Sequence, residues 1–254
     1  MGAPGRRLKE SSMDIKRLDW DSKFLGREVF AVTLPGVADE TPDLAGMVGS
    51  LRDQGASVAY LFVTSDDPGL RRQLSDCGAV LYDERVTFSK RLIAEPQTGV
   101  APGDEAIKVY NGEPTDELLA LALLAGHESR FRKDPRLHPF FEPLYRLWMI
   151  NSLKGTMADV VYVFQPDSGV KGFMTSKVGA DGVGNINLMA IDDAWRGKGM
   201  GGKFIAAAEA YFMARGVETS TIVTQETNTV ACGIYVRKGY AICKRVDIYH
   251  LWFN

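Results

Sequence analysis

The chain has 254 residues, enough for one large domain or two modest ones. Hydrophobic residues make up 45% and charged residues 24% of it, which is ordinary for a globular protein and argues against a disordered or membrane-embedded chain. Thirty basic and 32 acidic residues give a net charge of -2, so no whole-protein field would attract nucleic acid or an anionic membrane.

Targeting and metal-binding patterns are missing from the sequence. No run approaches the roughly 18 consecutive apolar residues that a membrane span needs, and the opening residues lack the apolar core of a secretory signal. We therefore expect a cytoplasmic protein with no membrane contact. Residues 1–12 are small and polar and predict a flexible tail. No His, Cys and Asp residues cluster at ligand spacing, so we expect no metal.

Residues 13–92 predict a small N-terminal α/β domain. Hydrophobic periodicity favours strands at 28–34, 57–64 and 79–90, and helices at 44–54 and 68–77. Residues 93–104 contain two prolines and two glycines without sustained periodicity, and predict a linker.

Residues 105–254 predict a second, larger domain. Apolar residues at three- and four-residue spacing favour helices at 116–125 and 139–153. Strand-like patterns occur at 107–110, 160–165, 169–177, 185–191, 219–224 and 241–252. These segments predict one sheet with helices packed around it.

A glycine-rich turn separates the predicted strand at 186–191 from a predicted helix at 202–214. The turn reads Arg196-Gly-Lys-Gly-Met-Gly201. Its glycines let the backbone approach a phosphate, and the first amides of the helix and its dipole favour an anion there. A pyrophosphate would fit. The glycines could instead serve only the turn, and Arg196 and Lys198 could be solvated loop residues.

A second motif follows the predicted strand at 219–224. It contains Asn228, Ala231, Tyr235 and the pair Gly239-Tyr240. The spacing resembles the Asn, Ala, Tyr and Gly-Phe/Tyr pattern of the GNAT superfamily of acetyltransferases. Arg196-x-x-Gly-x-Gly201 is similar to the acetyl-CoA loop of that superfamily, and the two motifs occur in its order. The resemblance implies, for 105–254, an α/β (α+β) GNAT fold with a central mixed, mostly antiparallel sheet flanked by helices.

The same resemblance implies acetyl-CoA as cosubstrate. The loop amides would hold its pyrophosphate, and the preceding strand would pair with its pantetheine arm. The implied cofactor-binding residues are Met189, Ala190, Ile191, Arg196, Gly197, Lys198, Gly199, Met200, Gly201, Gly202 and Asn228. Tyr235 would protonate the departing thiolate, provided that its phenol has a pKa near the ordinary value. Alternatively, Tyr235 could be a core aromatic residue, and Asn228 could cap a helix that begins near Thr229.

Two further segments resemble a narrower group, the dTDP-fucosamine acetyltransferases. They are Glu128-Ser-Arg-Phe-Arg132 and Asp19-Trp-Asp-Ser-Lys-Phe-Leu-Gly26. This resemblance implies a nucleotide-linked amino sugar as substrate and a smaller N-terminal domain. Arg130 and Arg132 would then bind the diphosphate, since arginine forks suit phosphate oxygens, and Phe131 would stack on thymine or sugar. A charged surface turn and a core aromatic residue are the alternatives.

The resemblance also implies the reaction. A neutral amine would attack the thioester directly, with a backbone amide near Met189 polarising the carbonyl oxygen. His127 and Glu128 are candidate bases, and each could also be a surface group. Two alternatives are a GNAT enzyme acting on another small amine or a protein amine, and a non-catalytic acyl-CoA-binding module. The sheet edge and apolar C-terminus are compatible with a homodimer.

Overall fold

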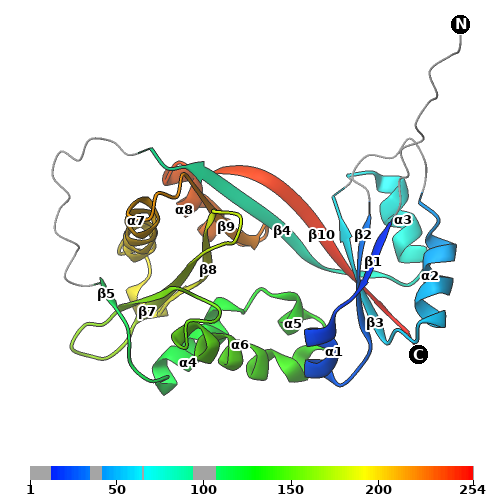
Figure 1. Ribbon diagram of the computed structural model, residues 1–254, viewed down its shortest axis with the longest axis horizontal. Coiled ribbons are helices and arrows are strands. Elements are labelled where there is room, and N and C mark those ends of the chain that lie inside the picture. The colour runs from blue at the N-terminus through cyan, green and yellow to red at the C-terminus, as the bar shows by residue number, and fades with distance from the viewer. Residues whose placement is uncertain (1–12, 35–41, 65, 94–106, 254) are drawn as a thin grey trace, which may run out of the picture. The chain divides into compact units, whose positions relative to one another are not determined.

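A computed structural model describes residues 13–34, 42–64, 66–93 and 107–253 (Figure 1). The chain forms two compact units: unit 1 comprises Met1–Glu84 with Val246–Asn254, and unit 2 comprises Arg85–Arg245. The predicted tail at 1–12 and most of the predicted linker at 93–104 lie outside the described residues. The expected domain boundaries therefore stay a prediction.

Unit 1 contains a small sheet and three helices. Its strands are β1 (Asp14–Arg17), β2 (Val29–Leu34), β3 (Val58–Val63), the start of β4 (Val80–Arg91) and the end of β10 (Ala241–Trp252), and its helices are α1 (Asp19–Leu25), α2 (Leu44–Asp53) and α3 (Pro68–Asp76). The strand order includes β1-β2-β3-β10. β2 and β3 are parallel, while β1 pairs with β2 and β10 pairs with β3 in antiparallel fashion.

Two helices of unit 1, α2 and α3, begin at side-chain caps. Asp43 accepts a hydrogen bond from the Gly46 amide at 2.9 Å, and Asp67 accepts one from the Gly69 amide at 2.8 Å. The apolar faces of α2 and α3 pack on the sheet. The buried core residues of this cluster include Phe30, Val32, Leu34, Met47, Leu51, Leu61, Leu70 and Leu74. Each such side chain contributes about 1.5–3 kcal/mol by its burial.

Unit 2 contains the larger sheet. Its elements are the rest of β4, then β5 (Ile107–Val109), α4 (Asp116–Ala125), α5 (Arg130–Lys133), α6 (His138–Leu153), β6 (Val160–Phe164), β7 (Gly172–Val178), β8 (Gly184–Ile191), a 3-10 turn η1 (Asp193–Trp195), α7 (Met200–Met213), β9 (Thr219–Gln225), α8 (Thr229–Arg237) and the start of β10. The strand order is β4-β9-β8-β7-β6-β5. Of these neighbouring pairs, β8 and β9 are parallel and the others antiparallel. Figure 1 shows α7 and α8 on one side of these strands and α4 and α6 on the other. The predicted mixed, mostly antiparallel sheet flanked by helices is confirmed.

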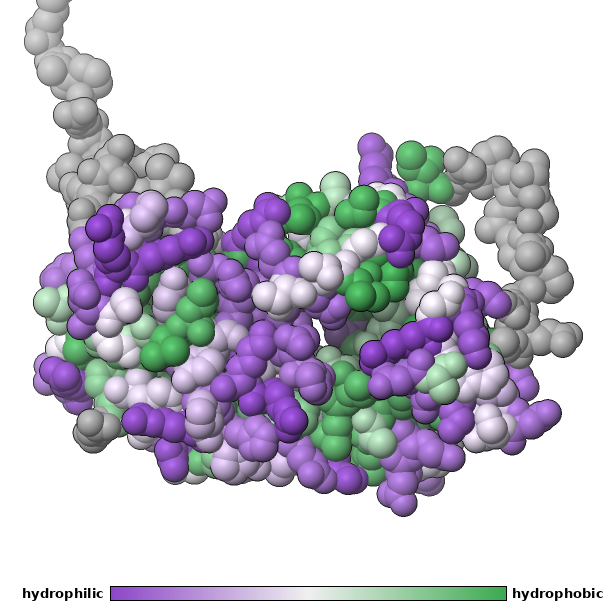
Figure 2. All heavy atoms as spheres, turned by 180° about the vertical axis from the view of Figure 1, so that it is seen from behind, coloured by the Kyte–Doolittle hydropathy of each residue, from purple (hydrophilic) through white to green (hydrophobic). Residues whose placement is uncertain are grey.

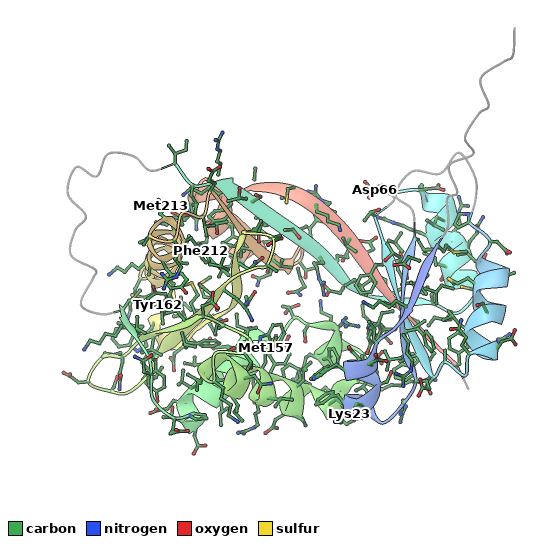
Figure 3. All side chains as sticks on the ribbon, viewed as in Figure 1. Lys23, Asp66, Met157, Tyr162, Phe212 and Met213 are labelled. Atoms are coloured by element: carbon green, nitrogen blue, oxygen red, sulfur yellow. The ribbon has the colours of Figure 1, made fainter. Side chains whose placement is uncertain are left out.

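One face of α7 forms the centre of the unit 2 core. Phe204, Ala208 and Phe212 repeat every four residues and are fully buried. They pack in one cluster with Phe88 of β4. Phe212, labelled in Figure 3, lies so close to Gly184 that a Cβ added there would come within 2.6 Å of its ring. The first residue of β8 must therefore be glycine for α7 to pack on the sheet.

The surface shows the expected distribution of side chains. On the face drawn in Figure 2, hydrophobic residues lie in separate groups among hydrophilic ones. In the part of the chain that the structure describes, no helix combines the length and the apolar character needed to cross a membrane.

Four short elements were not predicted, namely β1, α1, α5 and η1. Each has three to seven residues, too few for a hydrophobic period to show in the sequence. Helix α7 begins at Met200, two residues before the predicted start, because Gly199 adopts a left-handed conformation (φ +80°) and serves as its N-cap. β7 begins at Gly172, three residues after the predicted start.

Candidate acetyl-CoA site

The site begins where two parallel strands separate. β8 and β9 pair only from Gly184 with Ser220 to Ile186 with Ile222. At the next residue, β8 carries a bulge, because Thr175 of β7 faces Leu188 while Ser176 faces Ile186, which leaves Asn187 without a partner. A bulge bends its strand and increases the local twist. The rest of β8, through Ile191, has no recorded pairing with β9, so the two strands form an open slot.

The backbone of β8 turns hydrogen-bonding groups toward this slot. The Leu188 amide donates to Thr175 Oγ1 at 3.1 Å, and the Asp192 amide donates to the Lys171 carbonyl at 2.8 Å, both on the β7 side. Because successive residues of a strand direct their amides to opposite edges, the amides of Met189 and Ile191 face the slot. An extended ligand chain could add there as a strand would.

The glycine-rich turn lies at the end of this slot. Gly197 and Gly199 have φ values of +75° and +80°, a left-handed conformation that only glycine adopts at low cost. A Cβ at either position would meet no atom within 4 Å, so the glycines serve the backbone conformation and leave open space beside it. The amides of residues 197–201 donate no recorded backbone hydrogen bond to another described residue. Together with the α7 dipole, they form a suitable place for an anion.

The two cations of the turn have partners in this structure. Arg196 donates from Nε to the Ile191 carbonyl at 3.3 Å and pairs through Nη2 with Asp193 at 2.8 Å. Lys198 Nζ lies 4.3 Å from the centroid of the Trp195 ring. Both Arg196 and Asp193 are mostly exposed, and such pairs are worth little, so either cation can turn toward a phosphate at small cost.

Asn228 acts as a helix cap. Its Oδ1 accepts a hydrogen bond from the Ala231 amide at 3.1 Å, at the N-terminus of α8. The sequence had left helix capping open as an alternative to cosubstrate binding for this residue. The cap uses the oxygen of the side chain and leaves the amide nitrogen as a donor, so it is compatible with a contact to a ligand.

Tyr235 lies on α8 and is 5% exposed. Its ring packs edge-on against Phe88, with centroids 5.4 Å apart, in the same cluster as Met200 and Met189. Burial, with a smaller contribution from Cys232, raises the pKa of its phenol well above the ordinary value. The expectation of a near-ordinary pKa was therefore wrong, because it took no account of packing. The phenol stays protonated at every ordinary pH, and its hydroxyl has no recorded hydrogen-bond partner among the described residues.

The three predicted substrate residues occupy different environments. Phe131 is 6% exposed and forms part of the core. The Arg130 guanidinium lies 5.0 Å from the Phe131 ring. Arg132 is exposed and directs its guanidinium toward Phe141 and His138. The structure therefore does not bring these side chains together around one point.

The candidate bases are adjacent surface residues. His127 Nδ1 lies 3.4 Å from Glu128 Oε1, and Lys133 Nζ lies 3.2 Å from Glu128 Oε2. Partial burial would raise the pKa of Glu128, but the hydrogen bonds and charges of Lys133 and His127 outweigh it and lower the pKa. A carboxylate with a lowered pKa is a weaker base, which makes Glu128 the poorer of the two candidates.

Comparisons with known proteins concern the same part of the chain. Residues 124–240 match the model of the "Acetyltransferase (GNAT) family". The matched residues lie within unit 2, which has the GNAT fold. The family model includes the slot, the glycine-rich turn and α8, and the GNAT family uses acetyl-CoA. No curated protein sequence matches the chain.

Solved structures with the same fold span nearly the whole chain. A GCN5-related N-acetyltransferase from Sphaerobacter thermophilus is similar at 17% identity and a TM-score of 0.56, over 94% of this chain and 76% of that one. A protein described as functionally unknown and conserved, from Staphylococcus epidermidis, has a TM-score of 0.61 at 10% identity, over 98% and 94%. A GCN5-related N-acetyltransferase from Kribbella flavida has a TM-score of 0.52 at 15% identity, over 88% and 80%. At these identities the likeness concerns the fold.

Sequence reasoning missed one feature of the site, the bulge at Asn187. The burial of β8 alternates without interruption through this residue, so the hydrophobic pattern gives no sign of it.

Proposed function

We propose that the GNAT domain transfers the acetyl group of acetyl-CoA to an amine by direct attack on the thioester. The observation that carries this proposal is the slot between β8 and β9, which has backbone amides facing it and ends at a turn with unpaired amides. The turn residues Arg196–Gly202 would hold the pyrophosphate, and Met189–Ile191 would pair with the pantetheine arm. Asn228 would add a contact from the start of α8.

Acetyl-CoA supplies an activated acyl group, whose C–S bond breaks as a new C–N bond forms. The Met189 amide, which faces the slot, would donate a hydrogen bond to the carbonyl oxygen as negative charge develops on it. Tyr235 would give its proton to the departing sulfur, and the amine would lose a proton to water. The phenol would regain its proton from water after CoA leaves. The raised pKa of Tyr235 makes the phenol a weaker acid than an exposed tyrosine, so this proton transfer works against the effect of burial.

For the acceptor, we propose an amino-dideoxy sugar linked to a nucleotide, with dTDP as the nucleotide, used for cell-surface glycans. The support is the sequence resemblance of residues 19–26 and 128–132, together with the exposed position of Arg132. Arg132 would bind the diphosphate, while Arg130 lies against the buried Phe131 ring and would have to turn away from it to join that contact. Since Phe131 is buried, it would support α5 from the core and would not stack on the base.

One observation favours a second candidate, an acyl-CoA-binding module without transfer activity. Tyr235 is buried, and its burial raises the pKa of the phenol, which makes it a weaker acid. A domain of this kind would bind the cosubstrate in the same slot and release no thiol.

The experiment is a thiol-release assay with acetyl-CoA and three sets of amines: dTDP-4-amino-4,6-dideoxyhexoses, free amino sugars and amine-bearing peptides. We expect turnover on the nucleotide sugars. Turnover on peptides alone would contradict the sugar acceptor but support the transferase. Silence on every amine, with acetyl-CoA binding in calorimetry, would support the binding module.

A further inference from the structure

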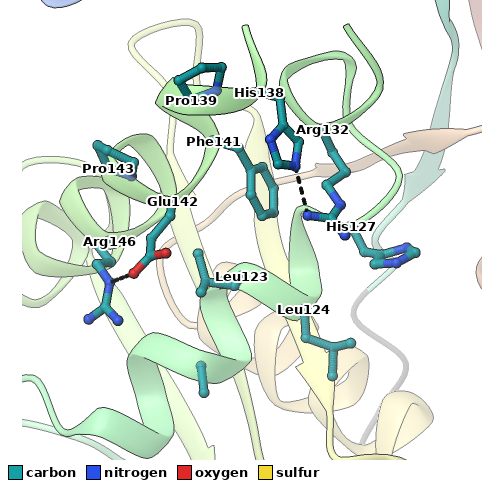
Figure 4. A pocket seen from close by; sticks show the side chains of 11 residues that line it. Leu123, Leu124, His127, Arg132, His138, Pro139, Phe141, Glu142, Pro143 and Arg146 are labelled. Carbon is teal, nitrogen blue, oxygen red and sulfur yellow. Dashed lines mark hydrogen bonds and ion pairs between the residues drawn. The ribbon is translucent and has the colours of Figure 1, made fainter. Parts of the chain in front are cut away.

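A groove lies on unit 2 between the outer faces of α4 and α6, with α5 at one end (Figure 4). Its volume is about 780 Å³, within the range of roughly 300–1,000 Å³ that is usual for small-molecule sites. Residues of all three helices line it. It contains two of the three histidines of the chain, His127 and His138.

The groove is lined by no residue of β8, β9 or the glycine-rich turn. Helix α4 contacts β8 and β7 of the sheet, and its residues Leu118 and Ala122 are fully buried. The groove is formed by other residues of the same helix, Leu123 and Leu124, which are half-buried. A ligand there would contact helix faces that the slot does not use.

The walls of the groove are mainly apolar. Leu123 and Leu124 contribute from α4, and Pro139, Phe141 and Pro143 contribute from α6. Figure 4 shows these side chains on opposite sides of the opening. A ligand with an apolar body would remove their surface from water, which is favourable by about 25 cal/mol per Å².

The charges of the groove are unevenly compensated. Glu142 and Arg146 pair at 2.8 Å, one helical turn apart, and so neutralise each other. Arg132, near the other end, lies 3.0 Å from His138 Nε2 through Nη1, and its guanidinium is 5.5 Å from the Phe141 ring centroid. Figure 4 shows the three side chains together. Among the described residues, Arg132 has no carboxylate partner.

We propose that this groove binds a small organic anion with an apolar body, such as an alkyl or aryl carboxylate. Arg132 receives the anionic head, because a guanidinium without a carboxylate partner can form charge-assisted hydrogen bonds at no cost of breaking an ion pair. His138 accepts a hydrogen bond from Arg132 Nη1 at Nε2 and so holds the guanidinium at this end of the groove. The apolar walls take the body. The inference shares Arg132 with the proposed acceptor site, but it concerns binding alone and does not depend on acetyl transfer.

The test is calorimetric titration of the full chain, without acetyl-CoA, with four probes of matched size or charge. Octanoate has both the anionic head and the apolar chain. Octylamine has the same chain with a positive head, and 1-octanol has it with an uncharged head. Acetate has the anionic head without the long apolar chain. We expect octanoate to bind more tightly than each of the other three. Equal binding of octylamine or octanol would overturn the anion site, and so would the absence of octanoate binding at millimolar concentration. Equal binding of acetate would overturn the role of the apolar walls.

Two arginine variants locate the head group. Arg132→Gln is expected to weaken octanoate binding by roughly tenfold or more. Arg146→Gln is the matched control, since it removes a groove cation that already has a carboxylate partner, and it should change affinity by less than about threefold. Equal effects of the two variants would overturn the assignment to Arg132. Thiol release by the wild-type chain, measured separately, reports on the proposed transferase whatever the outcome here.

Discussion

The two units contain the same series of elements and differ where the site is. In unit 1 the series is β2, α2, β3, α3 and the start of β4, and in unit 2 it is β8, α7, β9, α8 and the start of β10. In both, the first two strands are parallel. The second halves correspond residue for residue, from Asp67 to Arg91 and from Asn228 to Trp252, with a helix cap first and a left-handed glycine, Gly78 or Gly239, before the last strand.

The parallel pairs differ in how far they run together. β2 and β3 pair over the whole of Val29–Leu34 and Val58–Val63, without a break in register. β8 and β9 pair over three residues and then separate after the bulge at Asn187. In unit 1 the backbone N–H and C=O groups that could bind an extended ligand instead pair β2 with β3. The comparison teaches that the slot arises from an interrupted pairing and not from the order of elements.

The chemistry differs as well. The position of Tyr235 in α8 corresponds to Leu74 in α3, which is fully buried. The described part of unit 1 therefore has no phenol at the corresponding position, and the acetyl-CoA site proposed above lies in unit 2.

The largest expected effect comes from removing the phenol. Tyr235→Phe should lower kcat on the order of 100-fold, the usual contribution of a general acid, and change the acetyl-CoA Kd less than about threefold. Steady-state kinetics with calorimetry measures both. Tyr240→Phe is the control, since it removes another buried hydroxyl, which donates to Ser220 Oγ at 2.9 Å. An unchanged kcat for Tyr235→Phe would exclude the acid role.

A change to the turn should act on binding. Gly199→Ala places a side chain at φ +80°, which costs about 1–2 kcal/mol, and it should weaken acetyl-CoA binding about tenfold by shifting the amides. Gly55→Ala in unit 1, at φ +72° with open space around it, should lose similar stability in denaturant unfolding. Its acetyl-CoA affinity should remain unchanged. Loss of affinity in both variants would contradict a site confined to unit 2.

The smallest effect concerns the two helix caps. Asn228→Ala and Asp67→Ala should each lower the free energy of unfolding by about 1 kcal/mol. If Asn228 also contacts the cosubstrate, its variant alone should raise the acetyl-CoA Kd by about threefold. A pure capping role would leave both Kd values at the wild-type level.

Much of the fold could be predicted from local patterns. The bounds of α4 and β10 agree with those expected from the sequence, because long apolar periods and capping residues mark them. The short elements could not be predicted, since four residues such as Arg130–Lys133 become helical only where the surrounding core holds Phe131. The same packing buries the Phe131 side chain and leaves the Arg132 side chain exposed. The sequence had predicted that both side chains belong to one substrate site.

By itself, the sequence determined the order of strand, glycine-rich turn and helix, and it placed glycines where the backbone of the turn needs them. These depend on neighbouring residues and on the lack of a Cβ. The tertiary structure alone decided that β8 and β9 separate after Ile186 and that the Tyr235 phenol is buried with a raised pKa. Both depend on the pairing of β8 with β7 and on the packing of α8 against Phe88, which are contacts between residues far apart in the chain.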